Sequence, residues 1–320
     1  MSRDEVPLVI VVPIYEDIDA ASLLFKEIAR TVQPAPFVVA VDDGSIAQPV
    51  SPSLLATSGL RGVVLKLKRN VGHQKAIATG LSFASDRFGD DVIVVAMDSD
   101  GEDVPATISE IVKPLVESRY DVIVASRRSR VETVRFRAFY VVYKALFKLL
   151  TGRKISFGNF MALRNSGVKR LAVMPELWTH VAASVLSSKL RVATVPVDRG
   201  PRYAGKSKMN FVGLALHGFR ALMVFAEDVL VRVGIACTIV AILAVSGGFA
   251  AMVLKAFGFA TPGWFSLASG ILLLVFLQTG ALTLITLMLS GMIRTGGIIS
   301  AEEYRAYVDQ ELYVESVDQI

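Results

Sequence analysis

The first half of the chain alternates short apolar runs with amphipathic segments. Five apolar runs have the length and the β-branched composition of strands, and they lie at 8–14, 37–41, 62–67, 92–97 and 122–125. Between them, apolar residues at helical spacing predict helices at 20–32, 74–84 and 105–117. The first run is apolar without alternation, as in a strand buried on both faces. This β-α-β order predicts an α/β fold with a mostly parallel sheet covered by helices on both faces.

From residue 135 the pattern changes to aromatic residues surrounded by positive charge. One helical face of the segment 135–151 carries Phe136, Phe139, Tyr140, Tyr143, Phe147 and Leu150. An apolar face flanked by arginines and lysines is typical of a helix that lies on a membrane surface. A second such segment, 211–228, directly precedes the most apolar part of the chain. The alternative interpretation is that both helices pack on the sheet.

Two long uncharged runs follow, of 22 residues at 233–254 and of 38 residues at 256–293. A helix rises about 1.5 Å per residue and a bilayer core is about 30 Å thick, so each run can cross a membrane. We predict an antiparallel hairpin of two transmembrane helices within 229–295, at about 229–254 and 264–293. Neither run has a charge deep inside it, which argues against a transport pore.

Charge is distributed unevenly along the 320 residues. Residues 1–227 hold 30 basic and 22 acidic side chains, whereas the remainder holds 4 and 7. A hydrophobic content of 53% and a mean hydropathy of +0.52 are too high for an ordinary soluble protein. We therefore predict a basic globular domain at 1–210 that is anchored to a membrane. Arginines flank the outer ends of the hairpin, which places the globular domain and the tail in the cytoplasm.

The two ends and the cysteine content agree with that location. The single cysteine, Cys237, allows no intrachain disulfide, which suits a reducing cytosol. Charges within the first seven residues argue against a signal peptide. The tail at 296–320 has one arginine against six carboxylates, and we expect it to be a solvated acidic end.

An acidic cluster directly follows the fourth predicted strand, with carboxylates at Asp98, Asp100, Glu102 and Asp103. Carboxylates two residues apart at a strand end can turn toward one hard cation, such as Mg²⁺ or Mn²⁺. A calcium EF-hand loop is excluded, because its sixth position would be Asp103 instead of glycine and its twelfth Ser109 instead of glutamate. A solvated acidic turn remains the alternative.

Two weaker motifs accompany this cluster. Asp42-Asp43-Gly44-Ser45 ends the second predicted strand, and Asp-Gly by itself is a common turn sequence. The segment from Arg202 to Lys208 is a basic loop whose side chains could grip a diphosphate. The same loop could instead contact anionic lipid.

In this order and spacing, the motifs resemble those of the family 2 glycosyltransferases with a GT-A fold, and among them the polyprenyl-phosphate glycosyltransferases. The resemblance covers about Pro7 to Arg294. It is carried by Pro13-Ile14-Tyr15-Glu16-Asp17, Val41-Asp42-Asp43-Gly44-Ser45, Asn70-Val71-Gly72-His73-Gln74, Asp98-Ser99-Asp100-Gly101-Glu102-Asp103, Arg127, and the pair Arg202 and Lys208.

The resemblance implies an inverting, metal-dependent hexosyltransferase that moves a sugar from a UDP- or GDP-sugar to a polyprenyl phosphate at the bilayer. The implied ligands of Mg²⁺ or Mn²⁺ are Asp98, Asp100 and Glu102. The implied catalytic residues are Asp98, Asp100, Arg127, Arg202 and Lys208. Contacts to the nucleotide sugar are expected from Pro13, Tyr15, Asp17, Val41, Asp43, Asn70, Asp98, Ser99, Asp100, Arg202 and Lys208. We expect the acceptor phosphate to contact Arg127, Arg135 and Arg137.

The chain departs from the family pattern at several positions. Glu102 replaces a usual glutamine and Asp17 a usual glutamate, while Asn159 replaces an acidic residue that has been proposed as a base in relatives. A lipid phosphate is already ionised at pH 7, because its second pKa is about 6, so it needs no base. A different lipid or polysaccharide acceptor and an inactive nucleotide-binding scaffold remain alternatives. A homo-oligomer is compatible with the sequence, and no nucleic acid partner is expected.

Overall fold

The computed structural model describes residues 7–127, 134–153, 158–204, 211–259, 261–294 and 299–314. The chain forms two compact units. The first comprises Met1–Phe139, Ile155–Val224 and Gly297–Ile320, and the second comprises Tyr140–Lys154 and Phe225–Gly296. The segments before and after the apolar hairpin therefore belong to the same unit, to which the chain returns at its C-terminal end.

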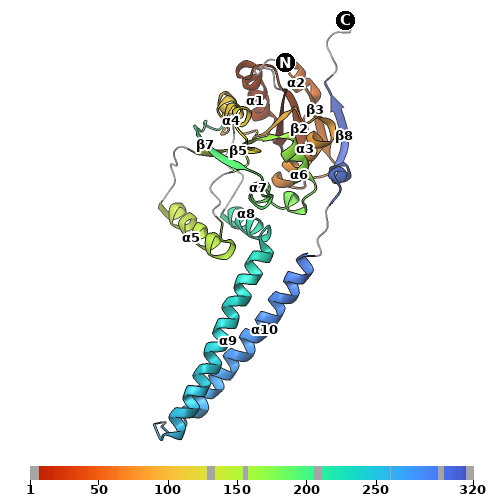
Figure 1. Ribbon diagram of the computed structural model, residues 1–320. Helices are drawn as coiled ribbons and strands as arrows, with labels where there is room; N and C mark the ends of the chain where they lie inside the picture. The colour runs from red at the N-terminus through yellow and green to blue at the C-terminus, as the bar shows by residue number, and fades with distance from the viewer. Residues whose placement is uncertain are drawn as a thin grey trace. The chain divides into compact units, whose positions relative to one another are not determined.

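An eight-stranded sheet forms the centre of the first unit (Figure 1), in the order β7-β5-β6-β4-β1-β2-β3-β8. The strands are β1 (Leu8–Ile14), β2 (Phe37–Asp42), β3 (Arg61–Leu67), β4 (Ile93–Ala96), β5 (Val122–Arg127), β6 (Met161–Arg164), β7 (Val192–Val197) and β8 (Val308–Tyr313). Strand β6 is antiparallel to β4 and β5, and β8 is antiparallel to β3. The other pairs are parallel. The predicted α/β fold with a mostly parallel sheet is confirmed.

Helices cover both faces of this sheet. One face packs on α1 (Ile18–Thr31), α2 (Pro52–Thr57) and α4 (Ile108–Glu117), the last preceded by the 3₁₀ turn η1 (Pro105–Thr107). The other face packs on α3 (His73–Arg87), α6 (Asn165–Ala172), α7 (Val181–Ser187) and the turn η2 (Pro175–Trp178). Successive residues of β1 face opposite cores, which explains its unbroken apolar run.

Close packing of α3 on the sheet depends on a glycine. A Cβ atom on Gly80 would lie 2.3 Å from Cγ1 of Val11 in β1. Because such a distance is far below van der Waals contact, glycine lets the helix backbone approach the strand. This approach fixes the start of α3 beside the edge of the sheet where the site described below lies.

The C-terminal segment packs against the first unit, so our expectation of a solvated end is wrong for residues 299–314. Strand β8 extends the sheet at β3, and the 3₁₀ turn η3 (Ala301–Ala306) packs on α3. Tyr304 of η3 is fully buried, and its ring lies edge-on to Phe83. Our expectation rested on the many carboxylates of this segment. The apolar positions between them decide where the segment packs.

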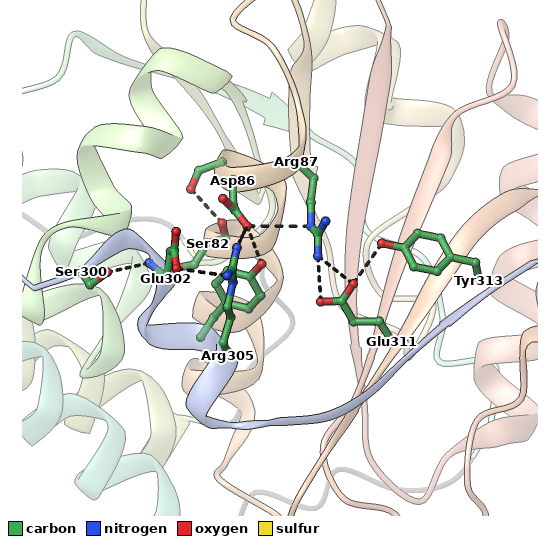
Figure 2. A network of polar contacts seen from close by, with 10 residues as sticks. Ser82, Asp86, Arg87, Ser300, Glu302, Arg305, Glu311 and Tyr313 are labelled. Carbon is green, nitrogen blue, oxygen red and sulfur yellow. Dashed lines mark hydrogen bonds and ion pairs between the residues drawn. The ribbon is translucent and has the colours of Figure 1, made fainter.

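Polar contacts hold the same segment in place (Figure 2). The hydroxyl of Tyr304 donates to Asp86 at 2.7 Å, and Arg305 contacts the same carboxylate at 3.0 Å. Farther along, Arg87 pairs with Glu311 of β8 at 3.0 Å. Two adjacent residues at the end of α3 therefore bind both η3 and β8.

The second unit contains most of α5 (Val134–Thr151) and the helices α9 (Ala226–Ala256) and α10 (Trp264–Arg294), which run side by side (Figure 1). Helix α8 (Phe211–Met223) precedes α9 in the chain. Ala226–Ala256 and Trp264–Leu289 are long and apolar enough to cross a membrane, and only 11% and 6% of their most apolar windows are buried. Since a core helix would be mostly buried, both are candidate membrane spans.

The apolar face of α5 differs from our expectation at Phe147, while the side chains of Phe136, Phe139 and Tyr140 lie outside the described residues. Phe147, predicted to lie on the membrane, is buried and meets the ring of Phe225 edge-on at 5.8 Å. Among the described side chains of this helix, the large exposed apolar ones are the aliphatic Val141, Val142, Leu146 and Leu149. At Phe147 the aromatic face packs inside the unit, because its ring contacts that of Phe225, which is distant in the sequence.

Candidate functional site

Sheet topology brings the predicted motifs to one edge. The carboxyl ends of the parallel strands β1, β2 and β4 lie together, and Tyr15, Asp43 and Asp98 follow those ends. Strand β6 runs in the opposite direction, so Asn159, two residues before it, reaches the same edge. Ligands of open α/β sheets bind beyond this edge.

At the end of β2, two adjacent carboxylates organise two loops. Asp42 is buried and accepts backbone N–H groups of Ser45 and Val50, both at 2.9 Å. Asp43 accepts those of Val71 and Gly72 at 2.7 and 3.0 Å, from the loop that precedes α3. Burial raises the pKa of Asp43 above its ordinary value, although these hydrogen bonds act in the opposite direction.

The turn between these loops requires a glycine. Gly44 has a φ of +70°, and a Cβ atom there would lie 2.4 Å from the carbonyl carbon of Arg69. Only glycine combines this backbone conformation with so close an approach. The Asp-Gly pair is therefore more than a turn signal, because it locks the end of β2 against the loop that contains Asn70.

The loop after β1 contains a contact that our sequence analysis missed. Glu16, with a φ of +46°, accepts the backbone N–H groups of Ile46, Ala47 and Gln48 at 2.6 to 3.0 Å. The backbone N–H of Glu16 donates to Ser45 at 3.0 Å. The ends of β1 and β2 are thus tied together, and the adjacent Tyr15 has 43% of its surface exposed.

The acidic loop after β4 faces arginines. Arg202 contacts Asp100 at 2.8 Å and Glu102 at 3.2 Å. Within the loop, the carboxylate of Asp100 accepts the N–H of Glu102, and that of Asp103 accepts the N–H of Asp98, both at 2.9 Å. The contacts within the loop fold it back on itself. The positive charge of Arg202 partly neutralises Asp100 and Glu102.

Arg199 is a second arginine at this loop, which our sequence analysis did not single out. Its guanidinium forms an ion pair with Glu102, and its backbone pairs with Asp103. One residue before Arg202 and one after it add backbone contacts. The N–H of Gly200 donates to the Glu102 carbonyl, and the N–H of Tyr203 donates to the Asp100 carbonyl. The segment 199–203 therefore covers one side of the acidic loop.

Among the residues that the structure describes, no three histidine, cysteine or acidic side chains form a ready-made metal site. The donor chemistry nevertheless suits a hard cation, because oxygen ligands from carboxylates are what Mg²⁺ and Mn²⁺ prefer. Burial and the charge of Asp98 raise the pKa of Asp100, although Arg202 and Arg199 oppose this shift. A cation between Asp98 and Asp100 would relieve that repulsion.

A chain of polar contacts leads from the acidic loop to α7. His73 Nε2 lies 3.2 Å from the carboxylate of Asp98 and 3.2 Å from Asn159 Nδ2. Gln74 donates to Asn159 Oδ1 at 3.3 Å and accepts the backbone N–H of Val181 at 2.8 Å. Burial lowers the pKa of His73, but the nearby carboxylates, above all Asp98, raise it by more. The pKa of His73 is therefore above its ordinary value. The Asn159 amide N–H can only donate, so Nε2 of His73 accepts it when unprotonated and binds Asp98 when protonated.

Comparison with known proteins agrees with this arrangement. Residues 9–166 match the family described as Glycosyl transferase family 2. Residues 9–166 therefore correspond to a family 2 glycosyltransferase domain. An uncharacterized glycosyltransferase of Synechocystis is 26% identical to this chain over 281 residues, which cover 84% of this chain and 85% of the relative. A dodecaprenyl-phosphate galacturonate synthase of Rhizobium johnstonii is 25% identical over 216 residues, covering 63% and 61%.

Solved structures support the fold of the family 2 domain. Glucosyl-3-phosphoglycerate synthase from Mycobacterium tuberculosis, determined with Mg²⁺ and UDP, superposes with a TM-score of 0.50 at 16% identity. The match covers 70% of this chain and 79% of that chain. At this identity the likeness concerns the fold alone, which is GT-A-like as the resemblance implied.

The predicted site residues of the family 2 domain differ in how far the structure places them. Pro13 and Val41 are buried in their strands, Asp17 precedes α1, Asn70 is exposed, and Ser99 lies in the acidic loop. Some predicted contacts lie outside the described residues, namely the whole of Lys208 and the side chains of Arg127, Arg135 and Arg137. The roles given to all of these residues remain predictions.

Proposed function

We propose that this protein is a membrane-anchored, inverting glycosyltransferase that moves a sugar from a nucleotide-sugar donor to a polyprenyl phosphate. The observation that carries the proposal is the cluster of Asp98, Asp100 and Arg202 at the carboxyl edge of a family 2 domain whose chain also has two candidate membrane spans. The similarity to a dodecaprenyl-phosphate galacturonate synthase supports the choice of a lipid phosphate as acceptor.

The residues of the acidic loop suit departure of a nucleoside diphosphate. Asp98 and Asp100 would hold Mg²⁺ or Mn²⁺, with Glu102 beside them, and the bound metal would neutralise charge on the leaving diphosphate. Arg202, which pairs with Asp100, would contact the same diphosphate, and Lys208 is proposed to join it. Alignment and charge neutralisation are the main contributions required of the protein.

The reaction balances without a general base. An oxygen of the acceptor phosphate attacks the anomeric carbon, the bond from that carbon to the diphosphate oxygen breaks, and the electron pair leaves with the nucleoside diphosphate. Because the acceptor oxygen is already ionised near pH 7, no proton has to be removed. The presence of Asn159 where relatives have an acid is compatible with this reaction.

Membrane attachment by the hairpin agrees with the chain order. The segments on both sides of the hairpin belong to the first unit, so two crossings return the chain to the side from which it left. Arg220, Arg232 and Arg294 flank the outer ends of the hairpin and only Lys255 lies near its connection, which favours a cytoplasmic catalytic unit. Exposed apolar residues of α8, among them Val212 and Phe219, suit contact with the bilayer surface.

The proposal is tested with purified full-length protein, undecaprenyl phosphate and a panel of UDP- and GDP-sugars. We expect a product with one of the donors that forms only with Mg²⁺ or Mn²⁺ and not after chelation. Undecaprenol, which lacks the phosphate, serves as the matched control acceptor. Transfer to undecaprenol or to a polysaccharide, or nucleotide binding without transfer, would instead support the alternatives.

Replacement of Asn159 by aspartate tests whether the enzyme works without a base. A newly supplied base typically raises a rate about 10²–10⁴-fold, whereas we expect Asn159→Asp to leave the rate unchanged or lower it. The added carboxylate would lie beside His73 and near an anionic acceptor, where like charges repel. Single-turnover transfer by both forms is measured between about pH 5.5 and 8.5. A hundredfold gain would show that the native acceptor has a proton to lose.

A further inference from the structure

Two of the three histidines of the chain form a pair between α7 and α8. His180 is buried, with 3% of its surface exposed, and its Nε2 lies 3.1 Å from Nε2 of His217. The two rings are 4.3 Å apart between centroids and are tilted by 38°. Neither residue belongs to the motifs that carry the family resemblance, and the proposed mechanism uses neither of them.

Hydrogen bonding determines where the protons of this pair lie. Nδ1 of His180 accepts the backbone N–H of Ala183 at 3.2 Å, and since an amide can only donate, this nitrogen carries no proton. The proton of the neutral ring is therefore on Nε2, which donates to Nε2 of His217. His217 in turn carries its proton on Nδ1, so the pair presents one oriented N–H donor.

The pair remains uncharged at neutral pH. Burial, followed by the neighbouring His217, lowers the pKa of His180 to about 3. The pKa of His217 is also lowered, first by burial and then by the positive charges of His73 and Arg220, with Asp98 opposing them.

The chain of polar contacts that starts at the acidic loop ends beside His180. That chain runs from Asp98 to the backbone N–H of Val181, the residue next to His180. On the other side of the pair, His217 belongs to α8, which ends at Met223, just before the first candidate span begins at Ala226. The pair therefore lies between the residue next to the end of these contacts and the helix that precedes the first candidate span in the chain.

We propose that His217 binds the phosphate of the acceptor lipid through its Nδ1–H, and that His180 acts as a positioning residue that fixes the orientation of this donor. The inference rests on the proposed function and names a contact for its acceptor. An oxyanion is a strong acceptor for such an N–H group, and a fixed orientation reduces the entropy lost when the phosphate binds.

The test measures KM for undecaprenyl phosphate and for the donor separately. For His217→Ala we expect the acceptor KM to rise about 10- to 100-fold, the value of one hydrogen bond to a charged group, with the donor KM within twofold. His217→Asn, which retains an N–H donor, is expected to restore part of the loss. A purely structural role for His217 predicts no such split and no such rescue.

The positioning role is tested by His180→Asn. Asparagine is a good N-cap residue, so it can still accept the N–H of Ala183 and keep α7 in place, but it removes the imidazole that orients His217. We expect a smaller rise in acceptor KM than for His217→Ala. When His180→Asn is added to His217→Ala, the acceptor KM should rise no further, because residues that act as a unit are not additive. Ser184→Ala is the matched control, since the buried hydroxyl of Ser184 donates to the backbone carbonyl of His180, so the change removes a hydrogen bond of α7 without changing either imidazole.

The outcomes separate this inference from the proposed function. The inference would be overturned if the acceptor KM of His217→Ala stayed within twofold of wild type, or if the KM values for donor and acceptor rose equally. Transfer by the wild-type protein would still support the proposed function. Equal effects in Ser184→Ala would also overturn it, because they would assign the loss to packing of α7. Failure of the wild-type protein to use undecaprenyl phosphate would remove the function and the inference together.

Discussion

Replacement of Asp100 by asparagine is expected to reduce sugar transfer by about 10²–10³-fold or more, the size of one lost electrostatic contact to a transition state. Asparagine has nearly the same shape and can still accept the N–H of Glu102 that Asp100 accepts at 2.9 Å. It removes the charge that pairs with Arg202 and that would hold the metal beside Asp98. The loss should therefore appear in kcat without unfolding of the protein.

Two controls separate the role of Asp100 from a general loss of negative charge. Asp90→Asn removes a carboxylate of an exposed ion pair with Lys169, and it should leave kcat unchanged. Glu102→Gln restores the residue that relatives usually have, and it should retain substantial activity. Transfer is measured with saturating donor and with Mg²⁺ or Mn²⁺ titrated from zero. Full activity of Asp100→Asn, or of the wild-type protein in excess chelator, would contradict the proposed metal site.

Replacement of Tyr304 by alanine is expected to destabilise the first unit strongly. Truncation of a buried aromatic residue typically costs about 3–5 kcal/mol, and Tyr304 is fully buried with its hydroxyl bonded to Asp86. For a domain of this size, 1 kcal/mol shifts Tm by about 2–4 °C, so Tm should fall by about 6–20 °C. Thermal unfolding of the full-length protein is followed by intrinsic fluorescence in detergent.

Tyr313 in the same segment is the matched control. It is half-exposed and its hydroxyl donates to Glu311 of its own strand, so Tyr313→Ala should change Tm by no more than a few degrees. Equal Tm values for wild type and Tyr304→Ala would mean that the C-terminal segment contributes nothing to the stability of the unit. A chain ending at residue 298 should be at least as unstable as Tyr304→Ala, because it also loses β8.

The sequence by itself determined the strands of the first half, the two candidate spans and the location of the acidic loop. Each of these has a local cause. Strand β1 and the long uncharged runs are contiguous apolar segments, and hydrophobic burial acts on them whatever lies elsewhere in the chain. The acidic loop follows β4 directly, so a parallel sheet places Asp98 and Asp43 at one edge by topology alone.

Tertiary structure alone decided the features that depend on distant partners. Tyr304 and Asp86 are 218 positions apart in the sequence, and His180 and His217 are 37 positions apart. No local sequence pattern therefore predicts either contact. Composition misled us at the C-terminal segment, because a few buried residues such as Tyr304 outweigh exposed carboxylates that cost little in water. Asn159 shows the same principle at the site, since its contacts with His73 and Gln74 depend on the antiparallel direction of β6.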